Sequence, residues 1–110
     1  MIKDNNNIFS ADLYEAILRL NDLDEARRFF RDLLTEQEIL EFGKRWHAAQ
    51  MLENKKSYIE IEKETGLSSA TIARISKWLN HGMNGYKTII DKIRAHHHSD
   101  SATKQSRNQE

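Results

Sequence analysis

Apolar residues recur at intervals of three and four along most of this chain, and no stretch alternates apolar with polar residues for long. A spacing near 3.6 residues places side chains on one face of an α-helix, whereas alternation would indicate strands. The sequence contains no proline and only four glycines, so few positions interrupt a helix. We therefore predict an all-α protein of about six helices.

The ends of several predicted helices carry capping residues. Ser10 can cap the first helix, and Thr35 with Glu38 forms a capping box before the third. Ser57 and Glu60 form a second capping box before the fourth helix. The predicted helices cover residues 11–20, 23–33, 36–53, 57–64, 69–79 and 86–95.

Composition sets the limits of the folded part. Residues 1–9 (MIKDNNNIF) are mostly polar, and we predict a flexible N-terminus there. The end of the chain, 96–110, is polar throughout and is predicted to be a disordered tail. Residues 10–95 remain as one helical domain. With 31% charged residues in 110, such a domain is short of core, and a partner subunit would supply the rest.

Residues 57–79 have the features of a helix-turn-helix. Gly66 can adopt the left-handed conformation that ends a helix, and Ser68 can cap the next one. The inner positions are apolar and would pack the two helices together: Ile61, Leu67, Ile72 and Ile75. The outer face of the second helix is small or polar, so this helix could enter the major groove of DNA. The alternative is a plain αα-corner inside a helical bundle.

We expect the outward residues of this second helix to contact DNA. Ser69, Ala70 and Ala73 would face bases, while Arg74 and Lys77 would contact phosphates. Five residues near the two helix N-termini complete the predicted interface: Lys55, Lys56, Tyr58, Ser68 and Thr71.

The formal net charge is zero, but the charges are unevenly distributed. Residues 1–42 hold 5 Lys and Arg against 10 Asp and Glu, whereas residues 43–95 hold 10 against 5. A basic part that contains the helix-turn-helix, beside an acidic part, fits a DNA-binding protein with a separate dimerisation region. Clustering by chance is the simpler alternative.

The sequence argues against several other classes of protein. It contains no cysteine, so disulfides, thiolate nucleophiles and Cys-based zinc sites are impossible. No segment resembles a signal peptide or a membrane span, and we expect a cytoplasmic protein with no membrane partner. No catalytic arrangement or phosphate-binding glycine loop indicates an enzyme. Residues 96–98 (HHH) point in different directions on a helix, so neither a metal nor a cofactor is predicted.

Residues 35–86 resemble the Trp repressor superfamily, and most closely its YerC/YecD branch. The matching segments are LLTEQE, GKRW, SYIEIEKETGLSSATIARI and LNHGMNGY, of which ATIAR at 70–74 is the most specific. The resemblance implies an all-helical, intertwined, two-fold homodimer that displays one helix-turn-helix at each end. Such a dimer would supply the missing core.

The resemblance also implies a small-molecule pocket, because the Trp repressor binds tryptophan. Arg45 and Arg74 match the two arginines that hold this ligand, and Thr35 matches a residue beside the pocket. Ile75, however, replaces the Gly that lies against the indole, and Trp78 replaces a Ser. A branched side chain fills a packed slot, and Trp78 could fill the pocket from within. These departures argue against a tryptophan corepressor and leave open another effector or none. The two arginines could instead contact phosphates or form surface ion pairs.

Together these features predict a sequence-specific, repressor-like transcriptional regulator. Its dimer would insert residues 69–79 into two major grooves of a near-palindromic operator, with half-sites roughly 34–36 Å apart. The alternative from another class is a dimeric protein–protein interaction module that uses the same corner. The short chain counts against a third possibility, a transposase-type fragment.

Overall fold

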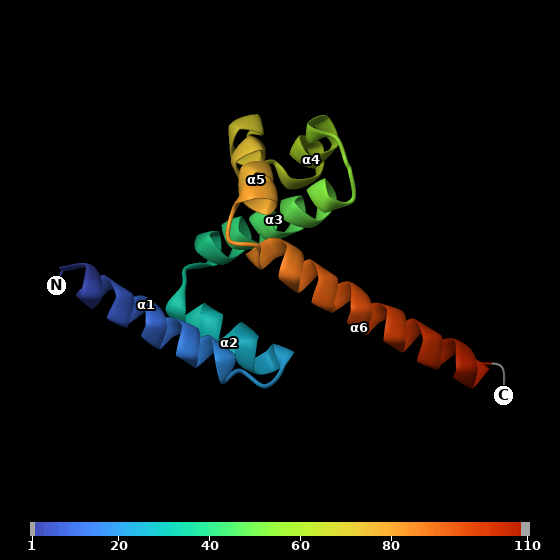
Figure 1. Ribbon diagram of the computed structural model, residues 1–110, viewed down its shortest axis with the longest axis horizontal. Coiled ribbons are helices and arrows are strands. Elements are labelled where there is room, and N and C mark those ends of the chain that lie inside the picture. Colours follow the sequence, from blue (N-terminus) through green and yellow to red (C-terminus); the bar gives the residue numbers. More distant parts are fainter. Residues whose placement is uncertain (1, 109–110) are drawn as a thin grey trace. The chain divides into compact units, whose positions relative to one another are not determined.

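The computed structural model describes the backbone of residues 2–108 and the side chains of residues 7–97. In that range it contains six helices and no strand, which confirms the all-α prediction (Figure 1). The helices are α1 (Ile2–Leu18), α2 (Leu23–Leu33), α3 (Glu36–Glu53), α4 (Tyr58–Thr65), α5 (Ser69–His81) and α6 (Gly85–Asn108). None of the described helices is long and apolar enough to cross a membrane.

The two terminal helices are longer than the sequence predicted. Helix α1 begins at Ile2 where we expected a flexible segment, so Ser10 lies inside the helix and does not cap it. Helix α6 continues to Asn108 where we expected a disordered tail from residue 96. Both expectations followed polar composition alone. A helix needs apolar residues only where it packs, and neither segment contains a proline or glycine that would end it. Residues 1, 109 and 110 lie outside the described part.

The first of two compact units, Met1–Leu40, has locally capped helices but no core among the side chains that the structure describes. The predicted capping box before α3 is confirmed, because the Thr35 N–H donates to Glu38 Oε1 (2.9 Å) and the Glu38 N–H donates to Thr35 Oγ1 (3.1 Å). Among residues 7–40, however, no side chain is buried. Leu18 and Leu23 are 73% and 84% exposed. Because short helices owe most of their stability to packing, this unit needs an apolar surface to cover it.

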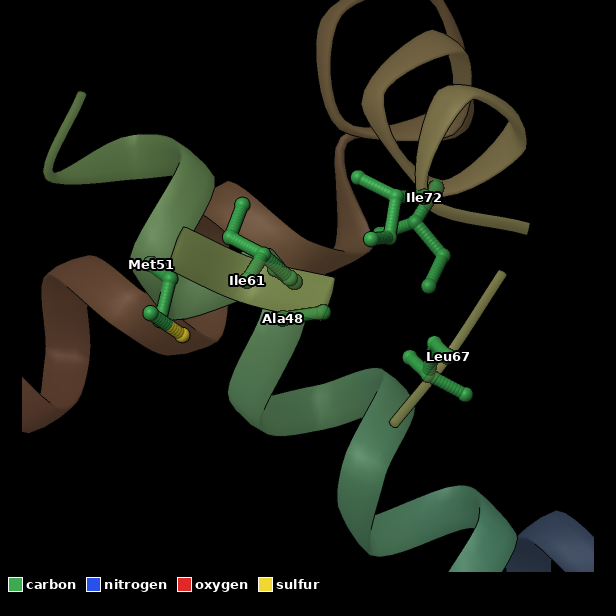
Figure 2. Packing of buried hydrophobic residues seen from close by; sticks show 7 residues of the cluster. Ala48, Met51, Ile61, Leu67 and Ile72 are labelled. Carbon is green, nitrogen blue, oxygen red and sulfur yellow. The ribbon is translucent and has the colours of Figure 1, made fainter. Parts of the chain in front are cut away.

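The second unit, Glu41–Glu110, holds the buried core. Helices α4 and α5 pack on α3, where Ala48 and Ala49 are fully buried and let the other helices approach closely. Side chains of α4, α5 and the corner between them complete this cluster: Ile61, Leu67, Ile72 and Ile75. Figure 2 shows labelled members of the cluster from α3, α4 and α5 meeting in one place. The spacing of apolar residues had predicted four of these positions, Ile61, Leu67, Ile72 and Ile75.

The turn between α5 and α6 requires glycine at position 82. The Gly82 N–H donates to the carbonyl oxygen of Trp78 (2.9 Å), and a Cβ at Gly82 would lie only 2.4 Å from that oxygen. Gly85 has nothing within 4 Å of such a Cβ.

We therefore expect Gly82→Ala to destabilise the protein by more than about 1 kcal/mol, because backbone must move to accommodate the methyl group. Gly85→Ala should be neutral or should stabilise by up to about 1 kcal/mol. Thermal unfolding of the two variants measures the difference, and equal midpoints would contradict the geometry of this turn.

Candidate nucleic-acid interface

The corner between α4 and α5 is a tight turn held by hydrogen bonds of Thr65, Gly66 and Leu67. Gly66 ends α4 in the left-handed conformation (φ 76°, ψ 5°), and its N–H donates to the Glu62 carbonyl (2.8 Å). The hydroxyl of buried Thr65 donates to the Ile61 carbonyl (2.7 Å) and accepts from the Leu67 N–H (3.1 Å). The buried polar group is therefore satisfied, and the angle between the two helices is fixed by backbone bonds as well as by the core.

Helix α5 starts at a serine cap, as predicted. Ser68 Oγ accepts from the Thr71 N–H (3.2 Å), and its own proton is directed to Thr71 Oγ1 (3.0 Å). Both residues were predicted to contact DNA. Because their hydroxyls bond each other, and because Thr71 is only half-exposed, their first role in this structure is to hold the beginning of α5.

The two faces of α5 differ sharply. Its inner face is packed, since Ile72 and Ile75 are fully buried and Leu79 is 4% exposed. The predicted DNA-contacting residues of its outer face are all exposed: Ser69, Ala70, Ala73, Arg74 and Lys77. Ala70 and Ala73 leave the N-terminal half of this face shallow, while the two cations follow within the next turn. A helix of this kind can approach the floor of a groove with its backbone flanked by phosphate-binding side chains.

The remaining predicted residues lie at the start of α4. Lys55 and Lys56 are exposed in the turn between α3 and α4, and Tyr58 is 40% exposed at the first position of α4. The Ser57 hydroxyl accepts from the Glu60 N–H (3.2 Å), which confirms the hydroxyl half of the second capping box. The cap orients the beginning of α4, so Lys55, Lys56 and Tyr58 lie at or just before the N-terminal end of α4.

Two contacts of α3 with the corner have no counterpart in the sequence prediction. His47 of α3 forms a short hydrogen bond with Glu64 of α4, which fastens the two helices outside the apolar core. Lys44 Nζ lies 4.0 Å from the position of a Cβ at Gly66, so a cation that the sequence did not single out is near the turn. In each pair, His47 with Glu64 and Lys44 with Gly66, the two residues are far apart in the chain, so no local sequence pattern connects them.

The residues predicted for an effector pocket have separate roles in this structure. Thr35 belongs to the first unit, where it caps α3. In the second unit, Arg45 is paired with Glu41 (3.3 Å) and Arg74 is exposed. Ile75 is fully buried in the apolar cluster, so it packs the core of its own chain.

Trp78, which could have filled a pocket from within, is 45% exposed. Within one chain it therefore does not occupy such a pocket.

The chain matches the family model described as Trp repressor protein over residues 10–94. It is 43% identical to the uncharacterized protein YerC of Bacillus subtilis over 82 residues, which cover 74% of this chain and 79% of YerC. The crystal structure of a TrpR-like protein from Eubacterium eligens matches with a TM-score of 0.73 and 42% identity, covering 76% of this chain and 86% of the other. That of a putative Trp repressor from Staphylococcus aureus matches with a TM-score of 0.77 and 34% identity, covering 86% of this chain and 94% of the other. This chain belongs to the Trp repressor family.

Proposed function

We propose that this protein is a homodimeric, sequence-specific DNA-binding regulator of transcription. Each α5 would enter a major groove of a near-palindromic operator. Because its target would be chromosomal DNA, we expect this protein to act in the cytoplasm. The observation that carries the proposal is the contrast between the two faces of α5. The inner face is packed against α3 and α4, while the outer face presents small residues followed by two cations and has no partner among the described residues.

The dimer is supported by the first unit. No side chain among residues 7–40 is buried, yet several large apolar side chains there are exposed. They include Ile8, Phe9, Tyr14, Leu18 and Leu23, which are 63–84% exposed. A second copy of the chain would cover these residues, as an intertwined dimer does. Two copies also present two equivalent α5 helices, which is what a two-fold operator requires.

We propose no role for tryptophan as corepressor. The buried position of Ile75 supports this proposal, because its side chain already fills the space between α5 and α3. Selection of DNA binding sites without any added ligand tests whether the protein requires another small molecule at Arg45 and Arg74.

The salt dependence of duplex binding tests the DNA function. Each lysine or arginine that neutralises a phosphate adds about 0.9 to the slope of log affinity against log salt concentration. If Lys55, Lys56, Arg74 and Lys77 of both copies each neutralise one phosphate, the expected slope is roughly −7. The measurement is a titration of a labelled duplex at several salt concentrations.

A dimeric protein-docking module is the second candidate. It is favoured by apolar side chains of the second unit that are exposed in one chain, Ile59 at 64% and Met83 at 98%. Such a module would show no appreciable duplex binding even at low salt, and that result would replace the DNA proposal.

A further inference from the structure

The turn between α3 and α4 holds a lysine in a conformation that favours glycine. The Lys56 N–H donates to the Met51 carbonyl (3.0 Å) and the Lys55 N–H donates to the Leu52 carbonyl (3.0 Å). This pair of bonds is the Schellman motif, whose left-handed position is most often occupied by glycine. Here that position is Lys55, at φ 64°. A side chain at this angle is strained, so the backbone gains nothing from having lysine there.

The same turn is fastened to α6. The Arg94 guanidinium donates from Nη2 to Oδ1 of Asn54, the residue just before Lys55. Eight residues earlier in each helix, the rings of Trp46 and Tyr86 stack with centroids 6.2 Å apart. The two contacts therefore join α3, and the turn that follows it, to α6 at two places that lie eight residues apart in each segment. The turn is thus supported from both sides, by the α3 backbone and by α6.

The bond from Arg94 to Asn54 places a third cation beside the turn that carries Lys55 and Lys56. Lys55, Lys56 and Arg94 are exposed, and none of them forms an ion pair within the part of the chain that the structure describes. Glu53 and Asp91, the carboxylates closest to them in sequence, form none there either. Lysines favour the C-terminal end of a helix dipole, which could account for their presence near the end of α3. The interaction with the helix dipole does not require a lysine in the left-handed conformation of Lys55, because Lys56 would provide the same interaction without backbone strain.

We propose that this turn is a preformed clamp for a DNA backbone phosphate, with Lys55 and Lys56 as the contacting residues. Asn54 and Arg94 are its positioning residues, which couple α6 to DNA binding. The inference rests on the proposed DNA function and extends it, because α6 then sets the direction in which the two lysines point. The preformed turn avoids the entropic cost of ordering a flexible loop when DNA binds.

The test measures affinity of the full chain for a labelled mixed-sequence duplex across a range of salt concentrations. Lys55→Gly removes one cation and relieves the backbone strain. Its thermal midpoint should rise by several degrees, while the salt slope should become shallower by about 0.9 for each copy that contacts DNA. Asn54→Ala removes the acceptor of Arg94 and keeps every cation. It should nonetheless lose about threefold in affinity at moderate salt for each phosphate contact that is lost.

Asn84→Gly is the matched control, since Asn84 is also left-handed (φ 63°) and carries no charge. It should leave affinity and slope unchanged. If the wild type binds with a steep slope and Lys55→Gly binds equally tightly with that same slope, the clamp is wrong and the proposed function stands. An Asn54→Ala variant with wild-type affinity overturns the positioning role of α6. If the wild type binds no duplex at low salt, the DNA function itself fails and the clamp fails with it.

Discussion

Replacing Ala70 with Glu should abolish sequence-specific DNA binding and leave the dimer intact. Ala70 is exposed on the outer face of α5, within the first turn of the helix, where the proposed interface approaches base edges most closely. A glutamate there would add bulk where the groove has little room and would place a carboxylate among phosphates. Juxtaposed like charges cost several kcal/mol, so we expect at least a ~100-fold loss of affinity for the cognate site.

The matched control is Ala95→Glu, which makes the same change at an exposed alanine of α6. It should bind the cognate site within a few-fold of the wild type. Gel shift and size-exclusion chromatography on both variants separate a lost DNA contact from a lost dimer. If Ala70→Glu binds as the wild type does, α5 is not the helix that reads DNA.

Truncating Ile61 to Ala should remove a large part of the stability of the helix-turn-helix. Ile61 is fully buried in the cluster formed by α3, α4 and α5. Deleting buried methyl and methylene groups of an isoleucine costs about 2–5 kcal/mol, against a typical total of about 5–15 kcal/mol for a whole domain. Urea unfolding followed by circular dichroism should therefore show a much lower midpoint.

Ile59→Ala makes the same chemical change two residues earlier in α4. Ile59 is 64% exposed, so its truncation should change stability by less than about 0.5 kcal/mol. Equal losses for the two variants would show that the buried cluster does not have the packing described above. A destabilising effect confined to Ile59 would indicate that a partner covers this face.

Local sequence signals predicted the middle of the chain well. The bounds of α2 and α3 agree with the spacing of apolar residues, and the cap formed by Thr35 and Glu38 is present with both of its hydrogen bonds. The left-handed turn at Gly66 and the cap at Ser68 follow from residue types whose conformational preferences are strong. Where a few neighbouring residues determine the structure, the sequence was sufficient.

The ends of the chain and the contacts between distant residues were not predictable in this way. Polar composition suggested loose ends, although nothing in either segment breaks a helix. The links from His47 to Glu64 and from Asn54 to Arg94 join residues far apart in the chain, and each pair consists of ordinary surface residue types. The spacing of apolar residues indicates which face of a helix is buried, but it does not indicate which polar side chains meet after the helices have packed.

The same limit applies to the candidate site. Spacing correctly placed Ala70 and Ala73 on the exposed face of α5 and Ile75 on the buried one. It gave no indication that Ser68 and Thr71 would bond each other, nor that Lys55 would occupy a left-handed position. These details depend on backbone geometry and not on the order of residue types.

The decisive experiment is selection of binding sites from a random duplex library with no small molecule added. We expect recovery of a near-palindrome whose half-sites lie about one helical turn apart, roughly 34–36 Å. That result would establish a sequence-specific dimer that requires no corepressor. Recovery of no enriched sequence, both without ligand and after addition of tryptophan and a metabolite mixture, would rule out the sequence-specific DNA function and favour a protein-docking role for the corner.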